Sequence, residues 1–255
     1  MPAGAPVVIE TRGLSRRFGE KVAVADLSLE VAAGEVFGFL GPNGAGKTTT
    51  IRMIAGLLKP TAGRVSIDGH DLAREPEAAK AALGFIPDRP FLYEKLTASE
   101  FLRFHGGLYG VEGDAVEARA TELLQLFELA AWRDELVESF SHGMKQRLVM
   151  CSAFLHRPRA VLVDEPMVGL DPRGARLIKE VFRVMSRKGV AILMSTHTLE
   201  VAEEMCDRIS IILGGRIIAC GTVPELHGLA GTEDAQLTPV FLKLTGGSGL
   251  QEIEL

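Results

Sequence analysis

The segment Gly41–Thr49, with the sequence GPNGAGKTT, constrains this chain more than any other. It fits the pattern G-x-x-x-x-G-K-[ST], in which glycines let successive backbone N–H groups converge on a phosphate. A helix that starts near Lys47 would add its positive N-terminal end. In this pattern Lys47 reaches the β- and γ-phosphates, and the Thr48 hydroxyl can bind Mg²⁺. The segment therefore predicts a nucleoside triphosphate site.

The flanks of the loop support this interpretation. The apolar run Val36–Leu40 predicts a buried strand that leads into the loop, and Thr49–Leu58 has the apolar periodicity of a helix. A chance glycine-rich turn would lack this strand–loop–helix order. The residues predicted to bind the nucleotide here are Gly41, Pro42, Asn43, Gly44, Ala45, Gly46, Lys47, Thr48 and Thr49.

The composition limits the classes of protein to which the chain can belong. Of the 255 residues, 47% are hydrophobic and 24% charged, which is typical of a globular chain long enough for one large domain or two small ones. The net charge of −5 argues against nucleic acid as a main partner, because no basic excess is available to neutralise phosphates. We expect no signal peptide and no membrane-spanning segment, since no apolar run approaches roughly 18 residues.

The three cysteines, Cys151, Cys206 and Cys220, are scattered along the chain. Their spacing does not match a metal site. We expect them to be small hydrophobic residues of the core in a reducing compartment.

Strand-like and helix-like segments alternate, a pattern typical of a mainly parallel sheet wrapped by helices. Val7–Arg12 and Val22–Val31 are predicted β-segments, and the core resumes with the apolar strand Ala160–Val163. Between about 88 and 155 the pattern is helical, which predicts a helical subdomain inserted into an α/β core. Further helices are expected over Gly174–Lys188, Leu199–Cys206 and, in the C-terminal tail, around Pro239–Leu244.

The strand Ala160–Val163 ends in two acidic residues, Asp164 and Glu165. A carboxylate at the end of an apolar strand is suited to hold Mg²⁺ opposite a phosphate-binding loop. Two adjacent acids allow two roles: Asp164 supports the metal, and Glu165 orients or deprotonates the attacking water. His197 follows the next predicted strand, at the edge where α/β sheets place ligands. We expect His197 to contact the γ-phosphate.

A second phosphate-binding helix start is predicted at Ser141–Gly143, where a hydroxyl, a small residue and a glycine open a helix. One nucleotide cannot easily use this segment and Gly41–Thr49 of the same subunit. A head-to-tail symmetric dimer can, because the loop of one subunit and Ser141–Gly143 of the other would close on one γ-phosphate.

These motifs together resemble those of the nucleotide-binding subunits of ATP-binding cassette (ABC) transporters, over about Val7 to Thr222. Gly41–Thr49 matches the Walker A motif, Val161–Glu165 the Walker B motif with its catalytic glutamate, and Gly169–Asp171 the D-loop. Phe140–Met144 is similar to the LSGGQ signature. By resemblance, His197 is the switch histidine, Phe18 is the aromatic residue that stacks on adenine, and Asp88 falls at the Q-loop and could reach Mg²⁺.

The resemblance implies a P-loop NTPase (RecA-like) core with an N-terminal antiparallel β subdomain and an inserted helical subdomain. It implies an ATPase domain over 1–230, with its core at 1–87 and 156–222, the helical subdomain at about 88–155, and a short tail at 231–255. ATP and Mg²⁺ are the implied cofactors. The implied partners are a second, identical or similar ATPase subunit and a membrane-spanning permease, on the cytoplasmic side of the cell membrane.

The chain departs from the signature of the family at several positions. Phe140 replaces Leu, His142 replaces the first Gly, and Met144 replaces Gln, whereas Ser141 and Gly143 are kept. We expect the His142 side chain to point to solvent. At the Q-loop, Asp88 replaces Gln and has a shorter reach, and Phe18 lacks a hydroxyl.

The segments after Asp88 and in the tail resemble the bacterial exporter branch of drug, antibiotic and polysaccharide export ATPases. The apolar run Pro90–Tyr93 fits either helix-packing core or a surface that receives a cytoplasmic helix of the membrane subunit.

Two other functions remain open: a cytosolic cassette ATPase that acts on ribosomes or DNA, and an ATP-dependent regulatory module. The chain has a single cassette, no heptad repeats and no basic excess, which argues against action on ribosomes or DNA. Lys47, Glu165 and His197 are all present, which argues against a purely regulatory module.

Overall fold

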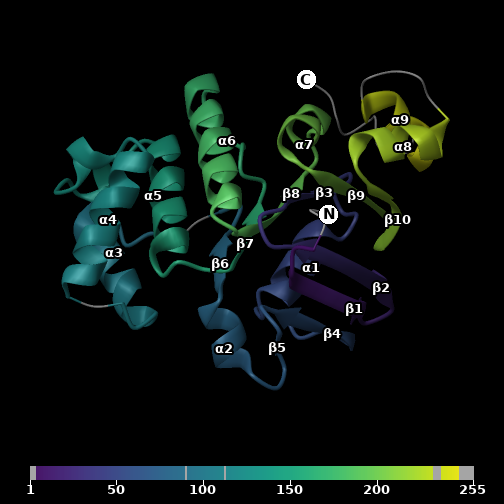
Figure 1. The fold of residues 1–255 in the computed structure, drawn as a ribbon, viewed down its shortest axis with the longest axis horizontal. Helices are drawn as coiled ribbons and strands as arrows, with labels where there is room; N and C mark the ends of the chain where they lie inside the picture. The colour runs from purple at the N-terminus through teal and green to yellow at the C-terminus, as the bar shows by residue number, and fades with distance from the viewer. Residues whose placement is uncertain (1–3, 90, 112, 232–236, 247–255) are drawn as a thin grey trace.

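A six-stranded sheet forms the centre of the molecule in the computed structural model, which describes residues 4–89, 91–111, 113–231 and 237–246 (Figure 1). The strand order is β10-β9-β3-β8-β7-β6, and every neighbouring pair is parallel except β9 and β10. This confirms the mainly parallel sheet. The strands are β3 (Val36–Leu40), β6 (Leu83–Ile86), β7 (Ala160–Asp164), β8 (Ala191–Thr196), β9 (Arg208–Leu213) and β10 (Arg216–Gly221).

A second, antiparallel sheet has the order β2-β1-β4-β5, as expected for the N-terminal β subdomain. Its buried side chains, among them Leu27 and Val31, share one core cluster with α1 and the central sheet. The first two strands are longer than the sequence pattern predicts because they form one hairpin that pairs up to Phe18 and Lys21. The strands are β1 (Val7–Phe18), β2 (Lys21–Ala32), β4 (Ala62–Ile67) and β5 (His70–Asp71).

Helices cover the central sheet, and three of them stand apart from it beside α6 (Figure 1). These three, α3 (Ala98–Leu108), α4 (Asp114–Leu126) and α5 (His142–Leu155), pack on one another and confirm the inserted helical subdomain. Two 3-10 turns, η1 (Ala130–Trp132) and η2 (Val137–Ser139), connect α4 to α5. The other helices are α1 (Lys47–Ile54), α2 (Pro76–Ala81), α6 (Pro172–Arg187), α7 (Leu199–Met205), α8 (Val223–Ala230) and α9 (Leu237–Thr245).

Some helices differ from the sequence prediction. The helix α1 ends at Ile54 rather than Leu58, because Gly56 adopts a left-handed conformation (φ 69°) that the helix cannot continue through. The helices α2 and α8 have no counterpart in the prediction. Thr222 and Glu225 form a capping box at the start of α8, a signal that the sequence carries. In the predicted tail, α9 packs on α7 and α8, and most of the GGSG stretch lies outside the described residues.

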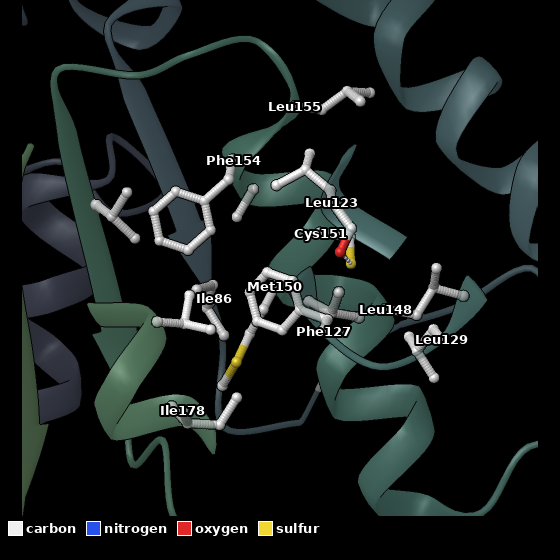
Figure 2. Close-up of a cluster of buried hydrophobic side chains, with 14 of the residues drawn as sticks. Ile86, Leu123, Phe127, Leu129, Leu148, Met150, Cys151, Phe154, Leu155 and Ile178 are labelled. Carbon is white, nitrogen blue, oxygen red and sulfur yellow. Dashed lines mark hydrogen bonds between the residues drawn. The ribbon is translucent and has the colours of Figure 1, made fainter. Parts of the chain in front are cut away.

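Aromatic rings connect the helical subdomain to the ATPase core. Figure 2 shows Phe154 and Phe127 in this buried cluster, together with Ile178 of α6. Phe154 at the end of α5 stacks on Phe127, with 6.3 Å between the ring centroids, and meets Phe182 of α6 edge-on at 6.4 Å. All three side chains are buried. Cys151 lies in the same cluster, and burial raises the pKa of its thiol. The prediction that the cysteines belong to the core is confirmed for Cys151 and for Cys206, which is half-buried. It is wrong for Cys220, which is exposed beside Arg208.

We predict that Phe154→Ala lowers the free energy of unfolding by about 3–5 kcal/mol, because it opens a cavity between α4, α5 and α6. Urea denaturation measures the change. The matched control is Leu229→Ala, whose side chain is 64% exposed on α8 and whose effect should stay within about 0.5 kcal/mol. Equal effects of the two substitutions would contradict this description of the core.

Candidate functional site

The phosphate-binding loop lies between β3 and α1, as predicted. Gly46 is the N-cap of α1 with φ 111°, a conformation that disfavours side chains. A Cβ at Gly46 would lie 2.7 Å from the carbonyl oxygen of Ala23, so the backbone of β2 also requires glycine there. Glycine carries no capping side chain, and the first N–H groups of α1 can therefore donate to a phosphate.

A pocket of about 300 Å³ opens at this helix end. It brings together the loop, the Q-loop position Asp88, the acidic strand end and His197, which the sequence separates by up to 155 positions. Gly41 and Ala45 lie behind the pocket wall: both are buried, and the Gly41 carbonyl accepts a hydrogen bond from Lys47. The lining residues are Pro42, Asn43, Gly44, Gly46, Lys47, Thr48, Thr49, Asp88, Glu165, Val168 and His197.

Glu165 lies between Lys47 and His197. Its Oε1 is 3.8 Å from Lys47 Nζ and 3.0 Å from His197 Nδ1. The Glu165 side chain is only 14% exposed, so solvent screens its interaction with the Lys47 ammonium only weakly. Glu165 also has φ 52°, a left-handed conformation that is rare outside glycine. A carboxylate held in this way can accept a proton from a water molecule beside a phosphate.

Asp164 is held differently from Glu165. Its carboxylate is buried and accepts a hydrogen bond from the Ser195 hydroxyl on the neighbouring strand β8. The Glu165 N–H donates to the Ser195 carbonyl oxygen at 3.2 Å. Ser195 thus orients both acids, a role that sequence reasoning missed. The signal was present, because Ser195 directly precedes Thr196 and His197 at the end of a predicted strand.

The signature segment lies in a different pocket, of about 530 Å³. Ser141 is the N-cap of α5, where its hydroxyl accepts the Met144 N–H at 3.3 Å. Asp171 is the N-cap of α6 and accepts the Gly174 N–H at 2.7 Å. Ser141, His142, Gly143 and Asp171 line this pocket, whereas none of them lines the pocket at the phosphate-binding loop.

Comparison with known proteins agrees with this arrangement. A family model described as ABC transporter matches residues 24–168, more than half of the chain. The chain belongs to the ABC transporter family. It is 39% identical to a daunorubicin resistance ATP-binding protein of Streptomyces coeruleorubidus, with coverage of 89% of this chain and 72% of that protein. It is 37% identical to the ABC transporter ATP-binding protein NatA of Bacillus subtilis, with coverage of 91% and 96%.

A solved ATP-binding subunit of an ABC transporter has the same fold, with a TM-score of 0.88 and 37% identity over 93% of this chain and 99% of that one. The chain is accordingly an ABC ATPase subunit that binds ATP. Among the described helices, none combines the length and the apolar character needed to cross a bilayer. Within the described part of the chain, acidic, histidine and cysteine side chains form no metal-binding group of three or more.

The ABC signature of this chain is unusual in how His142 is placed. The side chain is exposed, as expected, but its ring does not simply point to solvent. A Cβ on Gly169 would lie 2.6 Å from His142 Cδ2, so the ring rests on the D-loop backbone. Met144, by contrast, is half-buried and packs on the core of the helical subdomain, as Phe140 does.

Phe18 lies at the tip of the β1–β2 hairpin and is 47% exposed. It does not line the pocket at the phosphate-binding loop. The Arg16 guanidinium carbon is 4.6 Å from the centroid of its ring. Stacking of Phe18 on adenine stays a prediction.

A third concave surface is a groove of about 1050 Å³ beside the helical subdomain. Phe91 and Tyr93 line it with 79% and 44% exposure, and Tyr93 meets Phe104 edge-on at 5.1 Å between ring centroids. Leu92, in contrast, packs on the core of the subdomain. Of the residues after Asp88, Leu92 thus contacts the core, while two aromatic rings lie on the surface. Docking of a membrane subunit on this surface stays a prediction, and Pro90 lies outside the described residues.

We predict that Lys47→Ala abolishes ATP hydrolysis, lowering kcat by about 10²-fold or more, because the transferred phosphate loses a preorganised cation. Phosphate release by the purified chain measures it. Lys59→Ala, which removes a lysine beyond the end of α1, is the control and should hydrolyse at the wild-type rate. Near-normal turnover by Lys47→Ala would contradict the assignment of this site.

Proposed function

We propose that the chain energises export through a separate membrane subunit, by ATP-driven closure of two ATPase subunits. The observation that carries the proposal is the separation of the two phosphate-binding helix ends. Lys47, Glu165 and His197 surround one pocket, while Ser141 and Gly143 open another. Two subunits in head-to-tail symmetry would bring the first pocket of each against the second pocket of the other.

Oxygen ligands suited to Mg²⁺ are available at the phosphate-binding loop. The exposed Thr48 hydroxyl lines the pocket together with Asp88, and the Asp164 carboxylate is oriented by Ser195. We infer that Thr48 contacts the ion and that Asp164 supports it from behind, with Asp88 in place of the usual glutamine. When bound, Mg²⁺ neutralises part of the phosphate charge.

In hydrolysis each residue of the pocket has a distinct role. Lys47, which donates to the Gly41 carbonyl at 2.6 Å, turns its ammonium to the β- and γ-phosphates. Glu165 accepts the proton of the attacking water, and His197 contacts the γ-phosphate and holds Glu165 in place. Ser141 and Gly143 of the second subunit donate to the same phosphate. Loss of the γ-phosphate removes these contacts, so the dimer reopens.

We predict that Glu165→Gln retains ATP binding but traps the closed dimer, because the amide cannot accept the proton of water. Size-exclusion chromatography with ATP should show a dimer for Glu165→Gln and a faster return to monomer for the wild type. In the same background, Ser141→Ala should lower the dimer fraction without weakening ATP binding to the monomer. A Glu165→Gln variant that binds ATP and remains monomeric would contradict the head-to-tail arrangement.

The groove at Phe91 and Tyr93 is the proposed contact with a cytoplasmic helix of the membrane subunit. Its exposed aromatic rings lie beside Asp88, which lines both the groove and the ATP pocket. The names of several relatives refer to drug resistance, and one, of Burkholderia lata, is a Nod factor export ATP-binding protein. We infer export of a hydrophobic or amphipathic compound on that basis.

We predict that the chain co-purifies with an integral membrane protein of its source cell, and that Phe91→Ser with Tyr93→Ser abolishes this association because apolar contact area is lost. Leu229→Ser, which removes an equally exposed apolar side chain from α8, is the control. If the chain hydrolyses ATP but no membrane protein co-purifies with it, a soluble cassette ATPase is favoured instead.

A further inference from the structure

The loop that lines the groove is bound to the segment that leads into the signature. The Val137 N–H donates to the Leu96 carbonyl at 2.9 Å, and the Glu138 N–H donates to the Glu94 carbonyl at 3.0 Å. These two hydrogen bonds join the loop around Glu94 to the residues immediately before Phe140 and Ser141. Because the backbones are bonded to each other, a shift of the groove loop displaces the start of the signature.

A side-chain ion pair extends this connection into the signature helix itself. Glu94 Oε1 lies 2.5 Å from Lys145 Nζ, one turn into α5 from its N-cap Ser141. The Lys145 side chain is 23% exposed and that of Glu94 55%. The hydrogen bond from Lys145 lowers the pKa of the Glu94 carboxyl, so this carboxyl is ionised at neutral pH.

The charge of Glu94 compensates a local excess of positive charge. The first turn of α5 has no acidic residue of its own, and Lys145 and Arg147 add cations close to the positive end of the helix dipole. A carboxylate near a helix N-terminus is favourable, and here it comes from a different loop. Lys95, the next residue, pairs instead with Glu138 at 2.5 Å and makes no ion pair with α5.

We propose that Glu94 and Lys145 are positioning residues that fix the signature end of α5 relative to the groove loop. Through this pair, displacement of the aromatic surface next to Glu94 changes how far Ser141 reaches toward the γ-phosphate of the facing subunit. The inference rests on the proposed function, since it requires Ser141 to complete the ATP site. The inference extends the proposed function by naming the two side chains that connect the groove to the ATP site.

A double-mutant cycle on the full chain tests the pair. Glu94→Gln and Lys145→Met should each lower kcat for ATP hydrolysis about 3- to 10-fold with KM changed less than about 2-fold, because they misplace Ser141 without altering ATP binding. The double variant should be no slower than the slower single variant. The exchange Glu94→Lys with Lys145→Glu should recover part of the lost kcat.

The control is Arg176→Gln, which removes an exposed ion pair with Glu180 within α6 and leaves the groove loop unchanged. The Arg176 side chain is 83% exposed, and such pairs contribute little to stability, so kcat should be unchanged. All variants should keep the wild-type unfolding midpoint. Additive losses, or losses in KM rather than kcat, would overturn the proposal.

A covalent probe tests the connection to the groove without the membrane partner. N-Phenylmaleimide on Phe91→Cys, in a Cys220→Ser background, should change kcat by about 2-fold or more when the ion pair is intact and have no effect in Glu94→Gln. Cys151 is buried and Cys206 is half-buried, and desolvation raises the pKa of both thiols, so they should react far more slowly than a cysteine at position 91. The same effect in both backgrounds, or none in either, overturns the connection.

Different results would contradict the proposed function and the inference about Glu94 and Lys145. A wild-type chain that does not hydrolyse ATP contradicts the proposed function. A wild-type chain that hydrolyses ATP, with Glu94→Gln and Lys145→Met at the wild-type rate, contradicts this inference alone.

Discussion

The ATP site depends on the parallel pairing of β3, β8 and β7. Leu40, the last residue before the phosphate-binding loop, is in register with Thr196, and Ser195 is in register with Asp164. Parallel strands in register end at the same edge of the sheet, so this pairing alone brings three distant motifs together. The hydrogen bond from Ser195 to Asp164 then couples two of the strands through side chains as well.

Glu165 illustrates how this pairing produces chemistry. It follows the last residue of β7, and its backbone N–H donates to the Ser195 carbonyl. The left-handed conformation at Glu165 lies where the chain leaves the strand, and its carboxylate is between Lys47 and His197. Strain of this kind persists only where neighbouring contacts hold it, and it is commonly found at functional sites.

The signature belongs to the helical subdomain rather than to the sheet. Its position therefore depends on how α5 is attached: through Phe154 and Phe182 at one end, and through Glu94 and Lys145 at the other. The first attachment is buried, whereas the second is partly exposed and includes a loop of the groove. This difference is the physical basis for the proposal that the signature end shifts relative to the rest of the subdomain.

The motifs and their local structure could be predicted from the amino-acid sequence. The phosphate-binding loop, the acidic strand end, the capping box of α3 at Thr97 and the alternation of strands and helices are all local patterns, set by residue type and spacing. The helix α8 also has a local signal, the capping box that starts at Thr222, although it is absent from the sequence prediction. Motif matching was sufficient for the fold class and the family.

Contacts between distant segments could not be predicted in this way. No spacing in the sequence shows that Ser195 orients Asp164, that the His142 ring rests on Gly169, or that Glu94 pairs with Lys145 across 51 positions. The exposure of Phe91 and the partial burial of Leu92 likewise depend on how the loop meets the helical subdomain. These features follow from strand register and helix packing, which are set by the whole core rather than by any one segment.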